Sequence, residues 1–190
     1  MTQYYKDLVI IGNGGHAEVV IDACHLIGVK VRGLVSNINK QLFGIHTIGN
    51  DELLNDPNFL ADNLFFIGIG ENRKRKELFL KLEKNGGEFV SIVHPKAVVS
   101  THAVIAQGSF IAAGSVIQTG AQIGKNCIVN TGAQIDHHCI VGNHCHVAPN
   151  ATLAGNVVLG DGVFVGMNSC IVENTVIGEN FFIKAHTYCK

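Results

Sequence analysis

Residues 135–160 read IDHHCIVGNHCHVAPNATLAGNVVLG, and an aliphatic residue returns at every sixth position of this stretch. The same spacing holds over a much longer range without a slip in register. Sixteen consecutive positions are Val, Ile or Leu: Val93, Val99, Ile105, Ile111, Ile117, Ile123, Val129, Ile135, Val141, Val147, Leu153, Leu159, Val165, Ile171, Ile177 and Ile183. Self-similarity at a fixed period indicates a repeat architecture.

The repeat predicts short parallel strands that form the faces of a prism. One aliphatic side chain per strand points inward, and a mostly small residue, such as Cys139 or Cys145, follows four positions later. Three hexads make one coil, so residues 18 apart stack at the strand spacing of ~4.8 Å. Sixteen hexads give about five coils, each burying its aliphatic ring against its neighbours. Glycines directly after the aliphatic residue are expected to serve the tight corners; they are Gly124, Gly142, Gly160, Gly166 and Gly178.

The first part of the chain lacks the repeat and alternates between expected strands and helices. The strands are expected at residues 7–11, 30–35 and 63–69, the helices at 18–28, 50–55 and 71–85, with 88–93 leading into the coil. This alternation predicts a small, half-Rossmann-like α/β domain with a parallel sheet. We therefore expect two domains, residues 1–92 and 93–190.

Composition excludes several classes of protein. The chain has 190 residues, and 14 Lys+Arg against 15 Asp+Glu leave no basic excess for nucleic acid. Hydrophobic residues at 47% and charged residues at 15% argue against disorder. The N-terminus lacks a secretory signal, and no apolar run approaches the ~20 residues of a membrane span. Six cysteines without CxxC spacing are typical of reduced thiols, so we expect a cytoplasmic protein.

A glycine-rich turn follows the first expected strand. Gly12, Gly14 and Ala17 match the dinucleotide fingerprint formally. The acidic residue expected about 20 residues further on is missing, because the second strand ends in Val35-Ser36-Asn37. A phosphate cradle at the start of the helix and a tight turn without a ligand both remain open.

Four histidines lie within ten residues, at corner or outward positions where a groove between subunits would reach them: His137, His138, His144 and His146. Position 137 plus 18 is Gly155, so these two residues are expected one coil apart. An imidazole ordinarily titrates near neutral pH, which suits a general base. The Gly155 N–H would polarise a carbonyl as a one-donor oxyanion site.

Two other interpretations of the cluster stand beside the catalytic one. Hexapeptide-repeat carbonic anhydrases hold zinc with three histidines, two of them five residues apart, and this cluster contains no such pair; we expect no metal, although spacing leaves a site between subunits open. Exposed corner histidines without a role are the preferred interpretation for His138 and His144. Asp136 is the nearest acid that could orient His137, although neighbouring residues on a strand point to opposite faces.

The hexad series resembles the hexapeptide-repeat, left-handed β-helix acyltransferases. The order of an α/β domain before the β-helix resembles the sugar acetyltransferases grouped with sialic-acid O-acetyltransferases, whose best-understood members N-acetylate nucleotide-linked 4-amino-4,6-dideoxy sugars. Three stretches carry the resemblance: Gly14-Gly15-His16, Gly68-Ile69-Gly70-Glu71-Asn72-Arg73, and residues 130–146.

The resemblance implies a homotrimer with active sites between subunits and acetyl-CoA as co-substrate in grooves of the β-helix. It assigns the catalytic base to His137, a second active-site histidine to His146, the acetyl-contacting amide to Gly155 and a groove contact to Asn130. It also implies a nucleotide-linked amino sugar on the N-terminal domain, held by Gly12, Gly14, Gly15, His16, Asn72 and Arg73.

Simpler roles are open for several of these residues. His16 could cap the start of its helix, and Asn130 could bond to a neighbouring coil. Asn72 and Arg73 begin a charged helix, and the run at 73–76 predicts a solvated face.

The expected activity is acetyl-CoA-dependent N-acetylation of a nucleotide-linked amino sugar in surface glycan biosynthesis. O-acetylation of sialic acid or a related sugar is the alternative within the class. A non-catalytic trimeric scaffold that binds a sugar nucleotide is the alternative from another class. Two departures from the family bear on this expectation: Ser36-Asn37 stand where acidic residues are usual, and the chain ends mid-repeat where relatives continue into a tail that helps enclose CoA.

Overall fold

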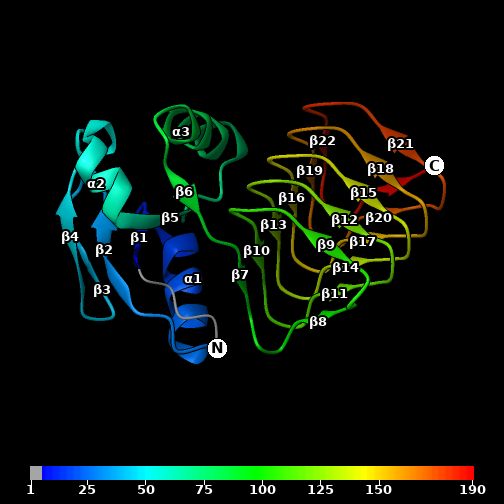
Figure 1. Cartoon of the computed structure of the whole chain (residues 1–190). Coiled ribbons are helices and arrows are strands. Elements are labelled where there is room, and N and C mark those ends of the chain that lie inside the picture. The colour runs from blue at the N-terminus through cyan, green and yellow to red at the C-terminus, as the bar shows by residue number, and fades with distance from the viewer. Residues whose placement is uncertain (1–5) are drawn as a thin grey trace. The chain divides into compact units, whose positions relative to one another are not determined.

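The computed structural model describes residues 6–190 (Figure 1), and its contacts divide the chain into two units between Val90 and Ser91. The sequence placed this boundary between residues 92 and 93. The expectation that the N-terminus lacks a secretory signal concerns in part the first five residues, which lie outside the described range. Within that range, no helix is both long and apolar enough to cross a membrane.

The first unit is an α/β fold built on one six-stranded sheet with the order β3-β4-β2-β1-β5-β6. Its elements are β1 (Asp7–Ile11), α1 (Gly15–Leu26), β2 (Val31–Val35), β3 (Gln41–Leu42), β4 (Ile45–Gly49), the 3-10 helix η1 (Leu53–Asn55), α2 (Pro57–Asp62), β5 (Asn63–Ile67), α3 (Asn72–Lys84) and β6 (Glu88–Phe89).

The sheet differs from the prediction in being mixed, since β3 and β4 form an antiparallel hairpin while the other neighbouring pairs are parallel. The hairpin turns at Phe43 and Gly44, both with positive φ. A two-residue turn of this kind usually carries Asn-Gly or Asp-Gly, so Phe-Gly gave little signal. Helix α2 was also missed, although Asp56 caps it by accepting from the Asn58 N–H at 2.9 Å, a recognisable start signal.

The second unit is a parallel β-helix whose three faces are sheets of six, six and five strands. Figure 1 shows these short strands stacked layer on layer. Each strand has two residues: β7 (Ile92–Val93), β8 (Val98–Val99), β9 (Val104–Ile105), β10 (Phe110–Ile111), β11 (Val116–Ile117), β12 (Gln122–Ile123), β13 (Ile128–Val129), β14 (Gln134–Ile135), β15 (Ile140–Val141), β16 (His146–Val147), β17 (Thr152–Leu153), β18 (Val158–Leu159), β19 (Phe164–Val165), β20 (Cys170–Ile171), β21 (Val176–Ile177), β22 (Phe182–Ile183) and β23 (Tyr188–Cys189).

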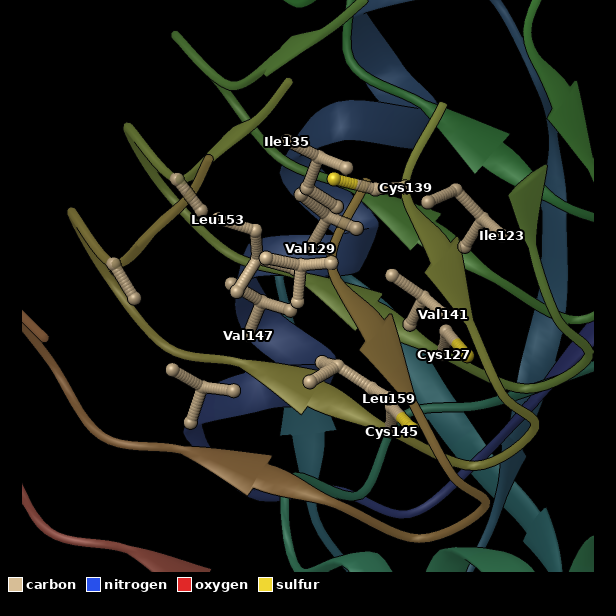
Figure 2. Close-up of a cluster of buried hydrophobic side chains, with 14 of the residues drawn as sticks. Ile123, Cys127, Val129, Ile135, Cys139, Val141, Cys145, Val147, Leu153 and Leu159 are labelled. Carbon is tan, nitrogen blue, oxygen red and sulfur yellow. The ribbon is translucent and has the colours of Figure 1, made fainter. Parts of the chain in front are cut away.

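The predicted 18-residue register is confirmed by the strand pairing. Ile135 pairs with Leu153, and Val129 pairs with Val147. The inward aliphatic residues between Ile111 and Leu159 are almost inaccessible to solvent, and Figure 2 shows several of them gathered with the interior cysteines. Removal of these aliphatic side chains from water is the main force that holds the coils together, at roughly 25 cal/mol per Å² of apolar surface.

The corners of the β-helix correct the prediction about glycine. The left-handed residue is the third after the inward aliphatic residue, and it recurs at every sixth position from Gly108 to His186, always as Gly, Asn or His. These residue types enter the left-handed region most readily. Gly142, one of the glycines expected at corners, has another role: a Cβ there would lie 2.7 Å from backbone atoms of the next coil. Glycine at this position permits close stacking of coils.

Candidate active site

His137 and Gly155 form the first candidate site, one coil apart. Leu153 pairs with Ile135 across β14 and β17, which carries residue 155 to the level of His137. The contact is close, because a Cβ added to Gly155 would lie 2.7 Å from Nε2 of His137. The His137 carbonyl accepts from the Asn156 N–H at 3.0 Å, which fixes the spacing of the two coils.

The local chemistry leaves both partners available to a substrate. His137 is exposed. Among the backbone hydrogen bonds of residues 6–190, the Gly155 N–H donates to no acceptor, while its carbonyl accepts from the Asn174 N–H at 3.0 Å. An imidazole beside an available backbone donor is an arrangement that can remove a proton and stabilise an oxyanion.

Asp136 takes a different role from the one considered for it. Its Oδ1 accepts the backbone N–H of His137 at 2.7 Å. Within residues 6–190, the ring of His137 has no carboxylate partner; its ring neighbour is His138, edge-on with centroids 5.5 Å apart. Asp136 therefore fixes the backbone that carries His137, and the expected orienting acid is not seen in the described chain.

Asn130 and His146 form a second pair. The Asn130 Nδ2 lies 3.1 Å from Nε2 of His146, and Asn130 Oδ1 accepts the Thr131 N–H at 2.8 Å. Because the amide oxygen faces Thr131, the NH₂ group of Asn130 faces the His146 ring. His146 stands at an outward strand position as expected, yet it is only 8% exposed, with its ring edge against Phe164.

His138 and His144 are corner residues of the β-helix. Both have positive φ, 56° and 60°, and they occupy the corner position that Gly, Asn or His fills from Gly108 to His186. The expectation that His144 is open to a groove is wrong, because it is 5% exposed and its Nδ1 lies 2.8 Å from Nδ2 of Asn126. The left-handed backbone at these corners favours residues such as His, Asn and Gly, and this explains His138 and His144 without a catalytic role.

Within residues 6–190, no three His, Cys, Asp or Glu side chains lie close enough together to hold a metal ion. The nearby Cys139 and Cys145 point into the interior, fully buried, and their thiols lie 3.1 Å from backbone carbonyl oxygens. Burial raises the pKa of the Cys139 thiol, which disfavours the thiolate that a metal requires.

A second candidate site lies at the carboxyl edge of the α/β sheet. The chain passes from β1 to β2 on one side and later returns to β5 on the other, and ligands of open α/β sheets bind at such switch points. Gly12 and Gly68 meet here: the Gly68 N–H donates to the Ile11 carbonyl at 2.8 Å, and a Cβ on Gly12 would lie 3.1 Å from the Gly68 carbonyl oxygen. The structure thus brings two of the predicted motifs together.

The start of α1 is open in the way an anion site requires. Gly14 is the N-cap residue and makes no side-chain capping hydrogen bond, and Gly15 is the first helical residue. A Cβ on either glycine would meet nothing within 4 Å. His16 is the second residue of α1 rather than its cap, and it lies beside Gly70, where an added Cβ would be 3.9 Å from the Cβ of His16.

The basic run at the start of α3 corrects the expectation of a solvated face. Arg73 is exposed, but Arg75 is only 1% exposed and donates to the carbonyls of Ile69 and Gly70 at 3.2 and 3.0 Å. It also donates to Asn72 Oδ1 at 2.8 Å. Arg75 therefore fixes the loop after β5, which contains Gly68, Ile69 and Gly70.

Sequence reasoning missed Arg75 because it lies within a charged run. The helical period contained the signal, since residues at i, i+3, i+4 and i+7 share one face. Residues 75, 78, 79 and 82 are the buried positions of α3.

The two units match different protein families. Residues 7–82 match the PglD N-terminal domain, and residues 120–155 match the bacterial transferase hexapeptide family of six repeats. Over nearly the whole chain, the fold is similar to that of PerB from Caulobacter crescentus in complex with CoA and GDP-perosamine. The two are 32% identical with a TM-score of 0.74, covering 98% of this chain and 93% of PerB.

This chain belongs to the hexapeptide-repeat sugar acetyltransferases, because it is 31% identical to the GDP-perosamine N-acetyl transferase of Caulobacter crescentus and covers 92% of that chain. Another solved structure, the acetyltransferase domain of PglB from Neisseria gonorrhoeae FA1090 in complex with acetyl coenzyme A, is 28% identical with a TM-score of 0.87, covering 98% of this chain and 93% of that one. The UDP-N-acetylbacillosamine N-acetyltransferase of Bacillus subtilis (strain 168) is 33% identical over 115 residues, 57% of this chain. That match spans about half the length of the curated relative, 52%.

The family membership confirms the predicted fold class. The two family matches follow each other along this chain as its two units do, and the three stacked parallel sheets agree with the predicted left-handed β-helix. The names of the relatives also agree with the predicted class of reaction, since each is called an N-acetyltransferase or an acetyltransferase, or was solved with CoA.

Proposed function

We propose that this protein transfers the acetyl group of acetyl-CoA to the amino group of a nucleotide-linked 4-amino-4,6-dideoxy sugar, a reaction of surface glycan biosynthesis. The observation that carries the proposal is the contact between the exposed imidazole of His137 and Gly155 one coil away. The complexes of PglB with acetyl coenzyme A and of PerB with CoA and GDP-perosamine support the two substrates.

The reaction follows from the chemistry of these two residues. The amine nitrogen attacks the thioester carbonyl carbon, and the negative charge that develops on oxygen is stabilised by the Gly155 N–H. His137 accepts the proton that the amine loses. The tetrahedral intermediate then collapses, the C–S bond breaks, and the imidazolium returns its proton to the leaving CoA thiolate. No acyl-enzyme is needed because both substrates meet at one site.

The second pair on the β-helix supports acetyl-CoA binding. Asn130 and His146 contact each other across neighbouring coils, 3.1 Å apart, and the family resemblance assigns both residues to the acetyl-CoA groove. We infer from the family resemblance that the enzyme is a homotrimer with each active site between subunits; the exposed His137 would then be accessible to such a site.

The carboxyl edge of the α/β sheet is the proposed nucleotide-sugar site. The open start of α1 at Gly14 and Gly15 suits the diphosphate. Gly12 lets the two loops approach; His16 lies in the first turn of α1, and Asn72 and Arg73 begin α3. The six cysteines are free thiols, which fits a reducing compartment and supports the cytoplasm as the place of action.

The test is an acetyl-transfer assay with purified protein, acetyl-CoA and a panel of UDP-, GDP- and dTDP-linked 4-amino-6-deoxy sugars together with free sialic acid. CoA thiol release gives the rate, and mass spectrometry with periodate and amine-reactive probes locates the acetyl group. We expect one amino sugar to be N-acetylated. Acetylation of sialic acid on oxygen would overturn the choice of acceptor, and sugar-nucleotide binding without any turnover would favour the scaffold.

A further inference from the structure

The acid that is missing after β2 has a counterpart on the neighbouring strand. Strands β2 and β4 run parallel, with Val35 paired to Gly49 and the Ser36 N–H donating to the Gly49 carbonyl at 2.9 Å. Both strands therefore end at the same edge of the sheet. Asn37 stands two residues beyond β2, and Asp51 stands two residues beyond β4.

Asn37 and Asp51 are joined by two hydrogen bonds. Asn37 Nδ2 donates to Asp51 Oδ2 at 3.0 Å, and the Asp51 backbone N–H donates to Asn37 Oδ1 at 3.4 Å. The second oxygen of the carboxylate, Oδ1, accepts no hydrogen bond from any group of residues 6–190. A carboxylate held from one side with its other oxygen open is prepared to accept hydroxyl donors.

The same segment is tied to the glycine-rich turn. Asn13 Nδ2 donates to the Ile38 carbonyl at 2.7 Å. Lys40 Nζ donates to the Asn13 carbonyl at 3.3 Å and to Glu18 Oε1 at 3.1 Å. These bonds fix the loop after β2 against the start of α1, so the Asp51 carboxylate and the proposed diphosphate site belong to one edge of one sheet.

We propose that Asp51 binds the ribose hydroxyls of the sugar nucleotide and that Asn37 is its positioning residue. In α/β folds with a glycine-rich first turn, an acid at the end of β2 performs this task; here the acid comes from the end of the adjacent strand. The proposal rests on the proposed function for the presence of a sugar nucleotide. It adds a specificity, because a carboxylate that accepts from a ribose diol disfavours 2′-deoxyribose, which lacks one of the two donors.

The experiment measures binding of free nucleotides by titration calorimetry, with UDP against dUDP and GDP against dGDP. For the nucleotide pair that binds, we expect the ribose form to bind about tenfold or more tightly than the deoxy form, the effect of one hydrogen bond to a charged group. Asp51→Asn should abolish this preference. Asn37→Ala should reduce it, and Glu52→Gln, which removes an exposed neighbouring charge, should leave it intact.

Each outcome decides between the inference and the proposed function. A preference for ribose that survives Asp51→Asn, no preference in the wild type, or no binding of either pair overturns the inference. Acetyl-CoA binding by the variants verifies that they are folded. If the ribose preference follows Asp51 while no amino sugar is acetylated, the inference stands and the proposed function fails.

Discussion

The two units of this protein bring their site residues together by different means. In the β-helix a single rule, one coil every 18 residues, places His137 against Gly155 and pairs Ile135 with Leu153. In the α/β unit each contact is particular to its loop, as with Asn37 and Asp51 or Arg75 and Gly70. The difference shows that a repeat makes distant contacts calculable, whereas an irregular sheet reveals them only in three dimensions.

The largest loss of activity is expected from a change at Gly155, which the 18-residue spacing places beside His137. A methyl group there would occupy the space of the His137 ring, so Gly155→Ala should lower kcat about 10²-fold, the typical result of misplacing a catalytic group by about 1 Å. Gly178→Ala is the matched control, because a Cβ there meets nothing within 4 Å, and its kcat should equal that of the wild type. Normal turnover by Gly155→Ala would mean that the stacked pair is not the site.

Stacking of the coils can be tested separately from catalysis. Gly142→Ala would place a Cβ 2.7 Å from backbone atoms of the next coil, and backbone cannot move aside cheaply. We expect the free energy of unfolding to fall by about 1–3 kcal/mol, the usual cost of overpacking. Urea denaturation would measure it, again with Gly178→Ala as reference, since both glycines occupy the same hexad position. Equal stability of the two variants would contradict the role assigned to glycine here.

A smaller effect, confined to the other unit, is expected from Arg75→Met. This change removes the guanidinium that donates to the carbonyls of Ile69 and Gly70 but keeps an unbranched apolar side chain in the buried position. Nucleotide affinity should fall about tenfold, in line with the loss of charged hydrogen bonds, while acetyl-CoA affinity remains at the wild-type value. Calorimetric titration of each ligand would measure both, with Lys74→Met as control. Parallel loss of both affinities would show that the two sites are not separable in this way.

The smallest effect concerns Cys24, buried in α1, whose thiol pKa is raised to about 12 by burial. In the unfolded chain the thiol ionises near pH 9.0. Above that pH the unfolded state loses a proton that the folded state keeps, so the free energy of unfolding falls as pH rises and is unaffected below. Between pH 8 and pH 10, the free energy of unfolding should fall by about 1 kcal/mol less in Cys24→Ala than in the wild type. Identical losses in urea denaturation at the two pH values would argue against a buried, neutral thiol.

The sequence predicted most of the β-helix because burial repeats with its period. It predicted the inward ring, the coil length and the neighbourhood of His137 from counting alone. It misplaced the corner glycines, because periodicity reveals a restricted position but not its φ angle. The same limitation left His138 and His144 unexplained until their left-handed conformation was seen.

In the α/β unit the sequence predicted the strands of the central sheet and the order of the motifs. It did not predict the antiparallel hairpin at 41–49, whose turn lacks the usual residues, or the role of Arg75. Asp51 was missed for a more general reason. The pairing of β2 with β4 brings it to Asn37, and which strands become neighbours is decided by packing of the whole sheet rather than by local sequence.

The coil register selects one histidine of the cluster, His137, for the proposed catalysis. The most direct test compares kcat for acetyl transfer in His137→Ala and His138→Asn, which change adjacent exposed residues. Asn is chosen because it tolerates the positive φ of position 138. We predict a loss of about 10²-fold or more for His137→Ala, the size expected for a general base, and less than about threefold for His138→Asn. Equal activity of the two variants, or full activity of His137→Ala, would contradict the claim.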